Sequence, residues 1–216
     1  MIFNKHGCVH IAIPKTGTFL RTALIKGINP SSAVGLISKK SNYGRLIDFK
    51  GGLDHPSYNF EVHGHFTISQ WRREVAKRHQ QDHAINNYVT FAFVRNPYDR
   101  FVSLWKTYGS EESISKFFRR KDWIQSKAGT QTEFIVDSTG NVAVDFVGKV
   151  EEIESDWEKL RKLVPSLPRY NSSYNCINND LNEEKDYMKY YSRSMKNLVY
   201  KRYKKDFINL GYDNEL

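Results

Sequence analysis

The sequence predicts an α/β domain with a mainly parallel central sheet, because segments with strand patterns alternate with segments of helical spacing. The clearest strand is Tyr88–Val94, which is β-branched or aromatic almost throughout, as strands covered on both faces are. The chain has 216 residues, 39% of them hydrophobic, and contains neither a repeat nor a linker-like tract. We therefore expect a single domain over residues 1–216.

Two units of strand, tight loop and helix are expected in this domain. The first has a strand at Cys8–Ile13 and a short helix at Phe19–Lys26. The second has the strand at Tyr88–Val94 and a helix that begins at Pro97, since the missing N–H of proline would be unpaired at the first helical position anyway. The carboxyl ends of parallel strands meet at one edge of a sheet, so the two loops should lie close together.

Further elements fill the rest of the chain. The segment Asp137–Asn141 separates two short apolar runs, as the turn of a hairpin would. In chain order, the other expected elements are an extended segment at Glu61–His65, a helix at Ile68–His79, hairpin arms at Phe134–Val136 and Val142–Val144, a strand at Asp145–Val150, and helices at Ile153–Val164 and Ser192–Asn209.

The formal net charge of +9 favours an anionic partner, such as a nucleotide, a nucleic acid, an acidic polysaccharide or a membrane surface. The two cysteines, Cys8 and Cys176, are too few for a disulfide framework and lack zinc-site spacing, so they fit a reducing compartment. No run reaches the roughly 20 apolar residues of a membrane helix, and the first residues do not resemble a signal peptide. We expect a soluble, cytoplasmic protein without a membrane partner.

The loop Pro14–Thr18 combines the components of an anion-binding site. A loop between a buried strand and a helix presents unpaired N–H groups and the positive end of the helix dipole. Gly17 allows close backbone approach and Lys15 adds a charge, while the hydroxyls of Thr16 and Thr18 add donors. The alternative is an ordinary turn with a solvated lysine and Thr18 as an N-cap. The Walker A pattern is absent, which disfavours an ordinary ATPase.

The segment Arg95–Ser103 is a second candidate anion site. Arg95 ends the strand, Asn96 can cap the helix, and Ser103 lies on the same helix face as Asn96, so Arg95 and Ser103 can flank one anion. The alternative is an ion pair between Arg95 and Asp99, with Ser103 as a small packing residue. Two such sites on one sheet edge suit a ligand with two separated phosphate groups.

Both segments resemble motifs of the sulfotransferase superfamily, in particular of its Golgi-type carbohydrate sulfotransferases, which include the uronyl 2-O- and chondroitin enzymes. Ile11–Thr18 is similar to the family's 5′-phosphosulfate loop and Phe93–Ser103 to its 3′-phosphate motif. Val144–Glu151 and Tyr203–Tyr212 also resemble family segments. The resemblance implies a three-layer α/β/α fold like that of P-loop NTPases, the donor 3′-phosphoadenosine 5′-phosphosulfate (PAPS), the product 3′-phosphoadenosine 5′-phosphate (PAP), and no metal.

The resemblance also assigns residues to the donor. The set that it implies is Lys15, Thr16, Gly17, Thr18, Phe19, Arg95 and Ser103, with Asn171 and Ser173 from a loop at Arg169–Ser173. A surface loop without a ligand is the alternative for Arg169–Ser173. Lys15 is well suited to neutralise the charge that develops on the leaving phosphate oxygen in an in-line transfer, so we count it as catalytic as well.

Glu61, His63 and His65 fall on one face of an extended segment, because side chains alternate along a strand. His63–Phe66 resembles the segment of the uronyl 2-O-type enzymes in which the second histidine is the general base. The resemblance thus implies that His65 accepts the proton of the acceptor hydroxyl, which suits a side chain with an ordinary pKa of about 6.5. The alternative is an exposed histidine without a catalytic role, since the chain has seven histidines.

The acceptor that the resemblance implies is a sugar or glycan, and an acidic one would match the net charge. We expect His63, Trp71 and Arg72 to bind it. Two other functions remain open. A P-loop-like small-molecule kinase would need a Walker lysine and an acidic magnesium ligand, and neither has a convincing candidate. A nucleic-acid-binding module without catalysis would use basic runs such as Lys201–Lys205, but no nucleic-acid signature is present and we expect no nucleic-acid partner.

Overall fold

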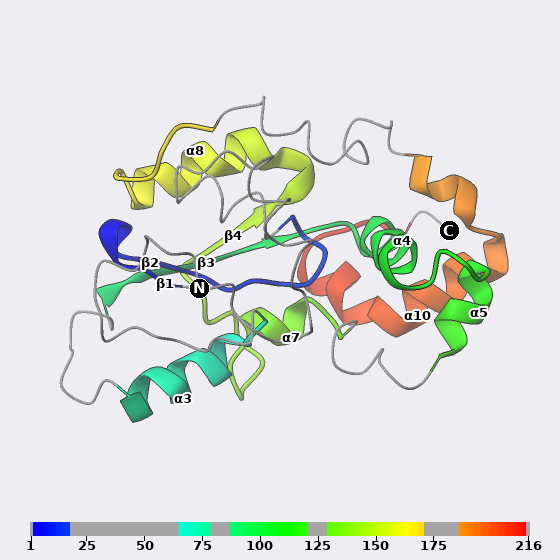
Figure 1. Ribbon diagram of the computed structural model, residues 1–216, viewed down its shortest axis with the longest axis horizontal. Coiled ribbons are helices and arrows are strands. Elements are labelled where there is room, and N and C mark those ends of the chain that lie inside the picture. The colour runs from blue at the N-terminus through cyan, green and yellow to red at the C-terminus, as the bar shows by residue number, and fades with distance from the viewer. Residues whose placement is uncertain (1, 18–64, 79–86, 121–128, 171–185, 215–216) are drawn as a thin grey trace.

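A four-stranded sheet in the order β1-β2-β3-β4 forms the centre of the molecule (Figure 1). This computed structural model describes residues 2–17, 65–78, 87–120, 129–170 and 186–214. The strands are β1 (Ile2–Phe3), β2 (Cys8–His10), β3 (Val89–Val94) and β4 (Phe146–Lys149). β2, β3 and β4 run parallel, and β1 pairs antiparallel with β2. The predicted α/β class with a mainly parallel sheet is confirmed.

Helices cover both faces of this sheet. Figure 1 shows α8 (Ile153–Leu163) along one face and α3 (Ile68–Arg78) with α7 (Thr132–Ile135) along the other. The helix starts at Ile68 and Ile153 are those that the apolar spacing predicts. None of the helices in the described ranges has the length and apolar character needed to span a bilayer.

The pleat of β3 explains how one strand serves two layers, because successive side chains point to opposite faces. Phe91 and Phe93 pack in the cluster that contains Trp157 of α8, and the ring centroids of Phe93 and Trp157 are 6.2 Å apart. Ala92 and Val94 pack in the cluster on the α3 and α7 side. Because β3 is packed on both faces, its orientation is fixed, and so is the point at which the next loop begins.

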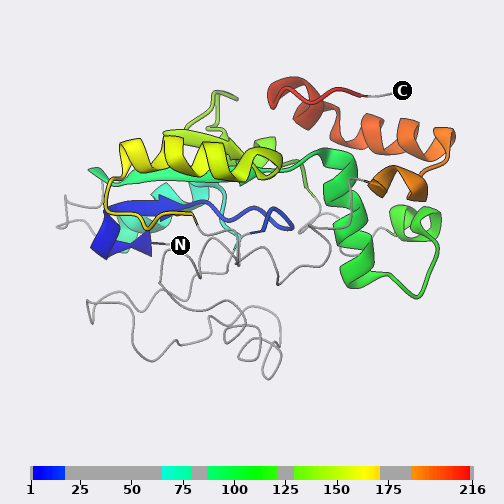
Figure 2. The ribbon, with the colours of Figure 1, turned by 90° about the horizontal axis from the view of Figure 1, so that it is seen from above.

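A second group of helices lies beyond the carboxyl end of β3 (Figures 1 and 2). It consists of α4 (Pro97–Tyr108), α5 (Ile114–Arg119) and α10 (Arg193–Asn209). The helix predicted to begin at Pro97 is confirmed, and the side chain of Asn96 accepts a hydrogen bond from the Tyr98 N–H as its cap. The buried apolar residues that join these helices include Tyr98, Phe101, Leu104, Phe117, Val199, Tyr203 and Phe207. Short 3₁₀ helices are η1 (Asn4–His6), η3 (Val150–Glu152) and η5 (Asp186–Tyr190).

One expected element is wrong, and another is shorter than expected, because the strand expected at Cys8–Ile13 ends at His10. The segment expected as a hairpin arm at Phe134–Val136 is largely helical, because α7 occupies Thr132–Ile135 and only one isolated bridge, Val136 to Val142, remains. The expected turn is present, since the Asp137 N–H donates to the Asn141 carbonyl oxygen at 2.9 Å. β1 and α5 have no counterpart among the expected elements. The helix expected at Phe19–Lys26 and residues 61–64 lie outside the described residues.

Candidate functional site

The loop that follows β2 has an unusual backbone. Lys15 has φ 65° and Gly17 has φ 69°, so two left-handed residues flank Thr16. A positive φ costs glycine little but is uncommon for a lysine. Successive residues in such turn conformations direct their N–H groups to a common concave side, which is the geometry of an anion-binding nest. The buried hydroxyl of Thr16 donates to the Ile13 carbonyl oxygen at 3.1 Å and ties the loop back to the buried segment that follows β2.

The side chain of Lys15 reaches α4. Its ammonium group donates to the hydroxyl of Thr107 at 2.7 Å, and that hydroxyl donates to the Ser103 carbonyl oxygen at 2.7 Å. Residues four apart lie on one side of a helix, so Asp99, Ser103 and Thr107 form one stripe along α4. Lys15 therefore lies against the stripe that carries the second predicted anion site.

Arg95 brings the two predicted sites into contact. Its guanidinium donates to both carboxylate oxygens of Asp99, at 2.6 and 2.8 Å, and to the Lys15 carbonyl oxygen at 3.4 Å. The ion pair with Asp99 was the alternative to an anion-binding role, and it is formed. It does not exclude that role, because these three bonds use only three of the five N–H donors that a guanidinium has. The half-buried Ser103 lies one helical turn beyond Asp99.

Arg100 is a further part of this region that the sequence analysis did not assign. It is 1% exposed, and its guanidinium donates to the Pro14 carbonyl oxygen at 3.0 Å and to the Gly129 carbonyl oxygen at 2.8 Å. Burial lowers the pKa of Arg100, while the nearby Tyr203, Asp206 and Glu133 act to raise it. A buried guanidinium bonded to backbone carbonyls anchors the first residue of the loop to α4.

The segment after Gly129 connects Arg95 to α10. The side chain of Gln131 accepts from the Arg95 N–H at 2.9 Å and donates to the Arg95 carbonyl oxygen at 2.7 Å. Asp206 of α10 accepts from the N–H groups of Gln131 and Thr132, both at 2.8 Å. Burial raises the pKa of Asp206 above its ordinary value, and these bonds, with the charge of Arg100, act in the opposite direction. In the sequence Asp206 follows Lys204 and Lys205, so no sequence signal marks it as a buried residue.

His65 lies beside the strand end that leads into the loop. Its Nδ1 is 2.8 Å from the Ala12 carbonyl oxygen. A carbonyl can only accept, so Nδ1 carries the hydrogen and the lone pair of the neutral ring is on Nε2. Ala12 is two residues before Pro14, and the side chain of His65 is exposed. The imidazole is thus oriented next to the loop with its basic nitrogen defined.

The structure uses Trp71 and Arg72 for packing. Trp71 is 6% exposed and belongs to the core cluster of Ile68 and Val94. The guanidinium of Arg72 donates to the Ala143 carbonyl oxygen at 2.8 Å, which attaches α3 to the segment that follows the Asp137–Asn141 turn. Neither contact tests sugar binding, so the acceptor-binding role of Trp71 and Arg72 stays a prediction. The other predicted site residues, Thr18, Phe19, His63, Asn171 and Ser173, lie outside the described residues.

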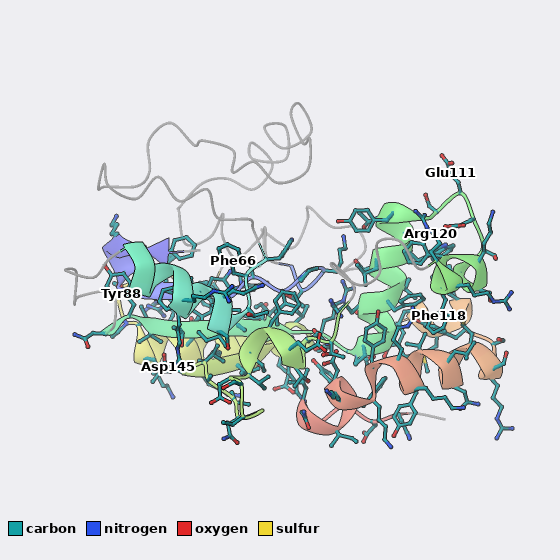
Figure 3. All side chains as sticks on the ribbon, turned by 90° about the horizontal axis from the view of Figure 1, so that it is seen from below. Phe66, Tyr88, Glu111, Phe118, Arg120 and Asp145 are labelled. Carbon is teal, nitrogen blue, oxygen red and sulfur yellow. The ribbon has the colours of Figure 1, made fainter. Side chains whose placement is uncertain are left out.

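A cavity of about 540 Å³ lies at the other end of α4, lined by Thr107, Tyr108, Gly109, Ser110, Glu111, Glu112, Lys116 and Arg120. Glu112 pairs there with Arg120 at 3.1 Å. Figure 3 shows Glu111 and Arg120 far from Phe66, the neighbour of His65. The cavity and His65 therefore lie at different ends of the region, and Thr107 of the cavity lining accepts a hydrogen bond from Lys15. Within the described ranges, no group of three or more His, Cys, Asp or Glu residues is arranged to hold a metal ion.

The fold and this region define an α/β protein in which a loop with left-handed backbone and a buried arginine lie at adjoining strand ends. A family model described as "Sulfotransferase family" matches residues 2–213. The chain belongs to this family and is a transferase of sulfuryl groups. No curated protein and no solved structure gives a significant match to the chain.

Proposed function

We propose that this protein transfers a sulfuryl group from PAPS to a hydroxyl group of a sugar, within one domain of the P-loop-like sulfotransferase fold. The observation that carries the proposal is the contact between Arg95 and the Lys15 backbone, at 3.4 Å. Two motifs 80 residues apart in the sequence thereby adjoin at one sheet edge. A nucleotide with phosphates at both its 3′ and its 5′ position is the ligand that needs two such cationic groups.

The described residues fit such a donor. The left-handed backbone at Lys15 and Gly17 suits the 5′-phosphosulfate. Thr16, Thr18 and Phe19 stay part of the proposed donor site on the resemblance. Arg95, held in place by Asp99, suits the 3′-phosphate together with the Ser103 hydroxyl. The loop at Arg169–Ser173, with Asn171 and Ser173, stays part of this proposal on the resemblance alone. When bound, PAPS supplies the sulfuryl group, and PAP is the leaving group.

Two residues of the chain act on the reacting groups in this proposal, His65 on the acceptor and Lys15 on the leaving group. Nε2 of His65 accepts the proton of the acceptor hydroxyl, since its bond from Nδ1 to Ala12 fixes the tautomer. The ammonium group of Lys15 stabilises the negative charge that develops on the phosphate oxygen of the leaving group. Its bond to Thr107 uses one of the three N–H donors of the ammonium group. We propose a glycan as acceptor because His63–Phe66 resembles the uronyl 2-O-type segment, with His63 positioning the sugar.

Binding and transfer can be tested together. We expect the purified protein to bind PAP in isothermal titration calorimetry and to transfer a labelled sulfuryl group from PAPS to a sugar, read by mass spectrometry. Transfer should continue in the presence of a chelator, whereas a kinase would use ATP and lose activity. Arg95→Gln removes the charge and should weaken PAP binding. Failure of the unmodified protein to bind PAP would refute the proposal.

A further inference from the structure

Behind the two phosphate-binding motifs lies a buried set of three polar side chains, Arg100, Gln131 and Asp206, which we call the brace. Their exposed fractions are 1%, 0% and 0%, so they are not placed to touch a nucleotide. Buried charged groups destabilise a fold unless they are well paired. The bonds that these residues make indicate what they hold in place.

Asp206 fixes the segment that carries Gln131. Its Oδ2 accepts from the Gln131 N–H, and its Oδ1 accepts from the N–H and the hydroxyl of Thr132, all at 2.8 Å. In Figure 1, α10 lies beside the start of α7, at the end of the sheet where β3 finishes. A carboxylate that accepts three hydrogen bonds within the core leaves this segment little freedom.

Gln131 transmits this position to Arg95. Its side-chain amide bonds to both the N–H and the carbonyl oxygen of Arg95, at 2.9 and 2.7 Å. The pairing resembles the exchange of bonds between neighbouring strands, and it extends the fixed backbone of β3 by one residue. The backbone that carries the guanidinium of Arg95 is therefore hydrogen-bonded through both its N–H and its carbonyl group.

Arg100 ties the same segment to the other motif. One end of its guanidinium bonds to the carbonyl oxygen of Gly129, two residues before Gln131, and the other bonds to that of Pro14. The loop with Lys15 and the backbone of Arg95 are thus both attached, through hydrogen bonds, to the segment of residues 129–131. Their separation is set by side chains that no phosphate needs to contact.

We infer that the brace sets the spacing of the two phosphate sites and so makes the protein selective for a nucleotide that carries both a 3′- and a 5′-phosphate. Arg100, Gln131 and Asp206 are positioning residues in this scheme. A rigid pair of sites gains the second phosphate contact only when its spacing matches the ligand. In catalysis, a misplacement of about 1 Å can lower the rate about 100-fold. The inference rests on the proposed function, because it presupposes the 3′,5′-nucleotide as ligand.

The test compares PAP with adenosine 5′-monophosphate, which lacks the 3′-phosphate. Dissociation constants for both are measured by calorimetry on the unmodified protein and on Gln131→Met, which has a similar length and no amide. The selectivity ratio is the dissociation constant of the monophosphate divided by that of PAP. We expect this ratio to fall about tenfold or more in Q131M, because PAP loses its second contact while the monophosphate loses little. Asp206→Asn, which removes at least one bond to the segment, carries the same expectation if Q131M does not fold.

The matched control is Thr132→Val, which removes the hydroxyl bond to Asp206 and leaves both bonds of Gln131 to Arg95. It should lower the melting temperature and keep the selectivity ratio. An equal loss of both nucleotides in Q131M, or an unchanged ratio, would show a purely structural role and overturn the inference alone. If the unmodified protein bound both nucleotides equally, the proposed donor would be wrong and the inference with it.

Discussion

Among single residues, the backbone of Lys15 is the feature that a purely structural loop explains least. A lysine held at a positive φ costs on the order of 1–3 kcal/mol, and such residues persist where their surroundings over-determine them. Here Arg95 bonds to its carbonyl and Thr107 to its ammonium group. Gly17 is also left-handed, as a glycine in a loop can be expected to be. No sequence signal predicts the same conformation for Lys15, two residues earlier.

His65 offers a residue-scale prediction, because its structural and chemical roles can be separated. His65→Ala should leave PAP binding unchanged and reduce turnover by about 100- to 10,000-fold, the usual contribution of a general base. Calorimetry and a sulfate-transfer assay measure the two quantities.

The informative companion is His65→Asn, whose amide N–H can replace the bond from Nδ1 to the Ala12 carbonyl oxygen without supplying a base. It should be as inactive as H65A. Normal turnover in H65N would mean that His65 only orders the chain near Ala12.

At the scale of elements, local signals predict what local forces build. β3 contains a run of β-branched and aromatic residues, and α4 has a capping residue and a proline at its start. Both elements form where expected. α7 differs because its first N–H groups are capped by Asp206, 74 residues away from Thr132. β1 has two residues, which is too short for any periodicity to show.

The β3–β4 pairing yields a prediction at this scale. A Cβ on Gly148 would lie 2.5 Å from Cε1 and 2.8 Å from Cδ1 of Phe93, whose ring is held against Trp157. Gly148→Ala should therefore destabilise the fold by about 1–3 kcal/mol through overpacking, measured as a lower urea midpoint.

Gly129→Ala is the control for that substitution, since its Cβ would meet only the flexible end of Glu133, at 3.0 Å. Its urea midpoint should stay near that of the unmodified protein. Equal midpoints for G148A and the unmodified protein would contradict the close packing of β4 on Phe93.

At the scale of the whole molecule, the contact between the two candidate anion motifs was predictable and the brace behind them was not. Parallel strands bring their carboxyl ends to one edge, so the order of elements alone places Lys15 near Arg95. Asp206 follows Lys204 and Lys205 in the sequence and looks like one member of a solvated charged run. Only the packing of α10 against α4 and α7 shows that it is buried.

The net charge of +9 leads to a prediction about the acceptor. A positive protein attracts an anionic sugar over distances that salt shortens, since the screening length is about 10 Å at 0.1 M ionic strength. With PAPS saturating, we expect kcat/KM for an acidic oligosaccharide to fall about tenfold between roughly 50 and 300 mM NaCl, and that for its neutral counterpart to change less than about twofold. Steady-state rates on the matched pair measure this. Equal salt dependence would mean that the charge serves the donor alone, because both reactions share the donor and differ only in the acceptor.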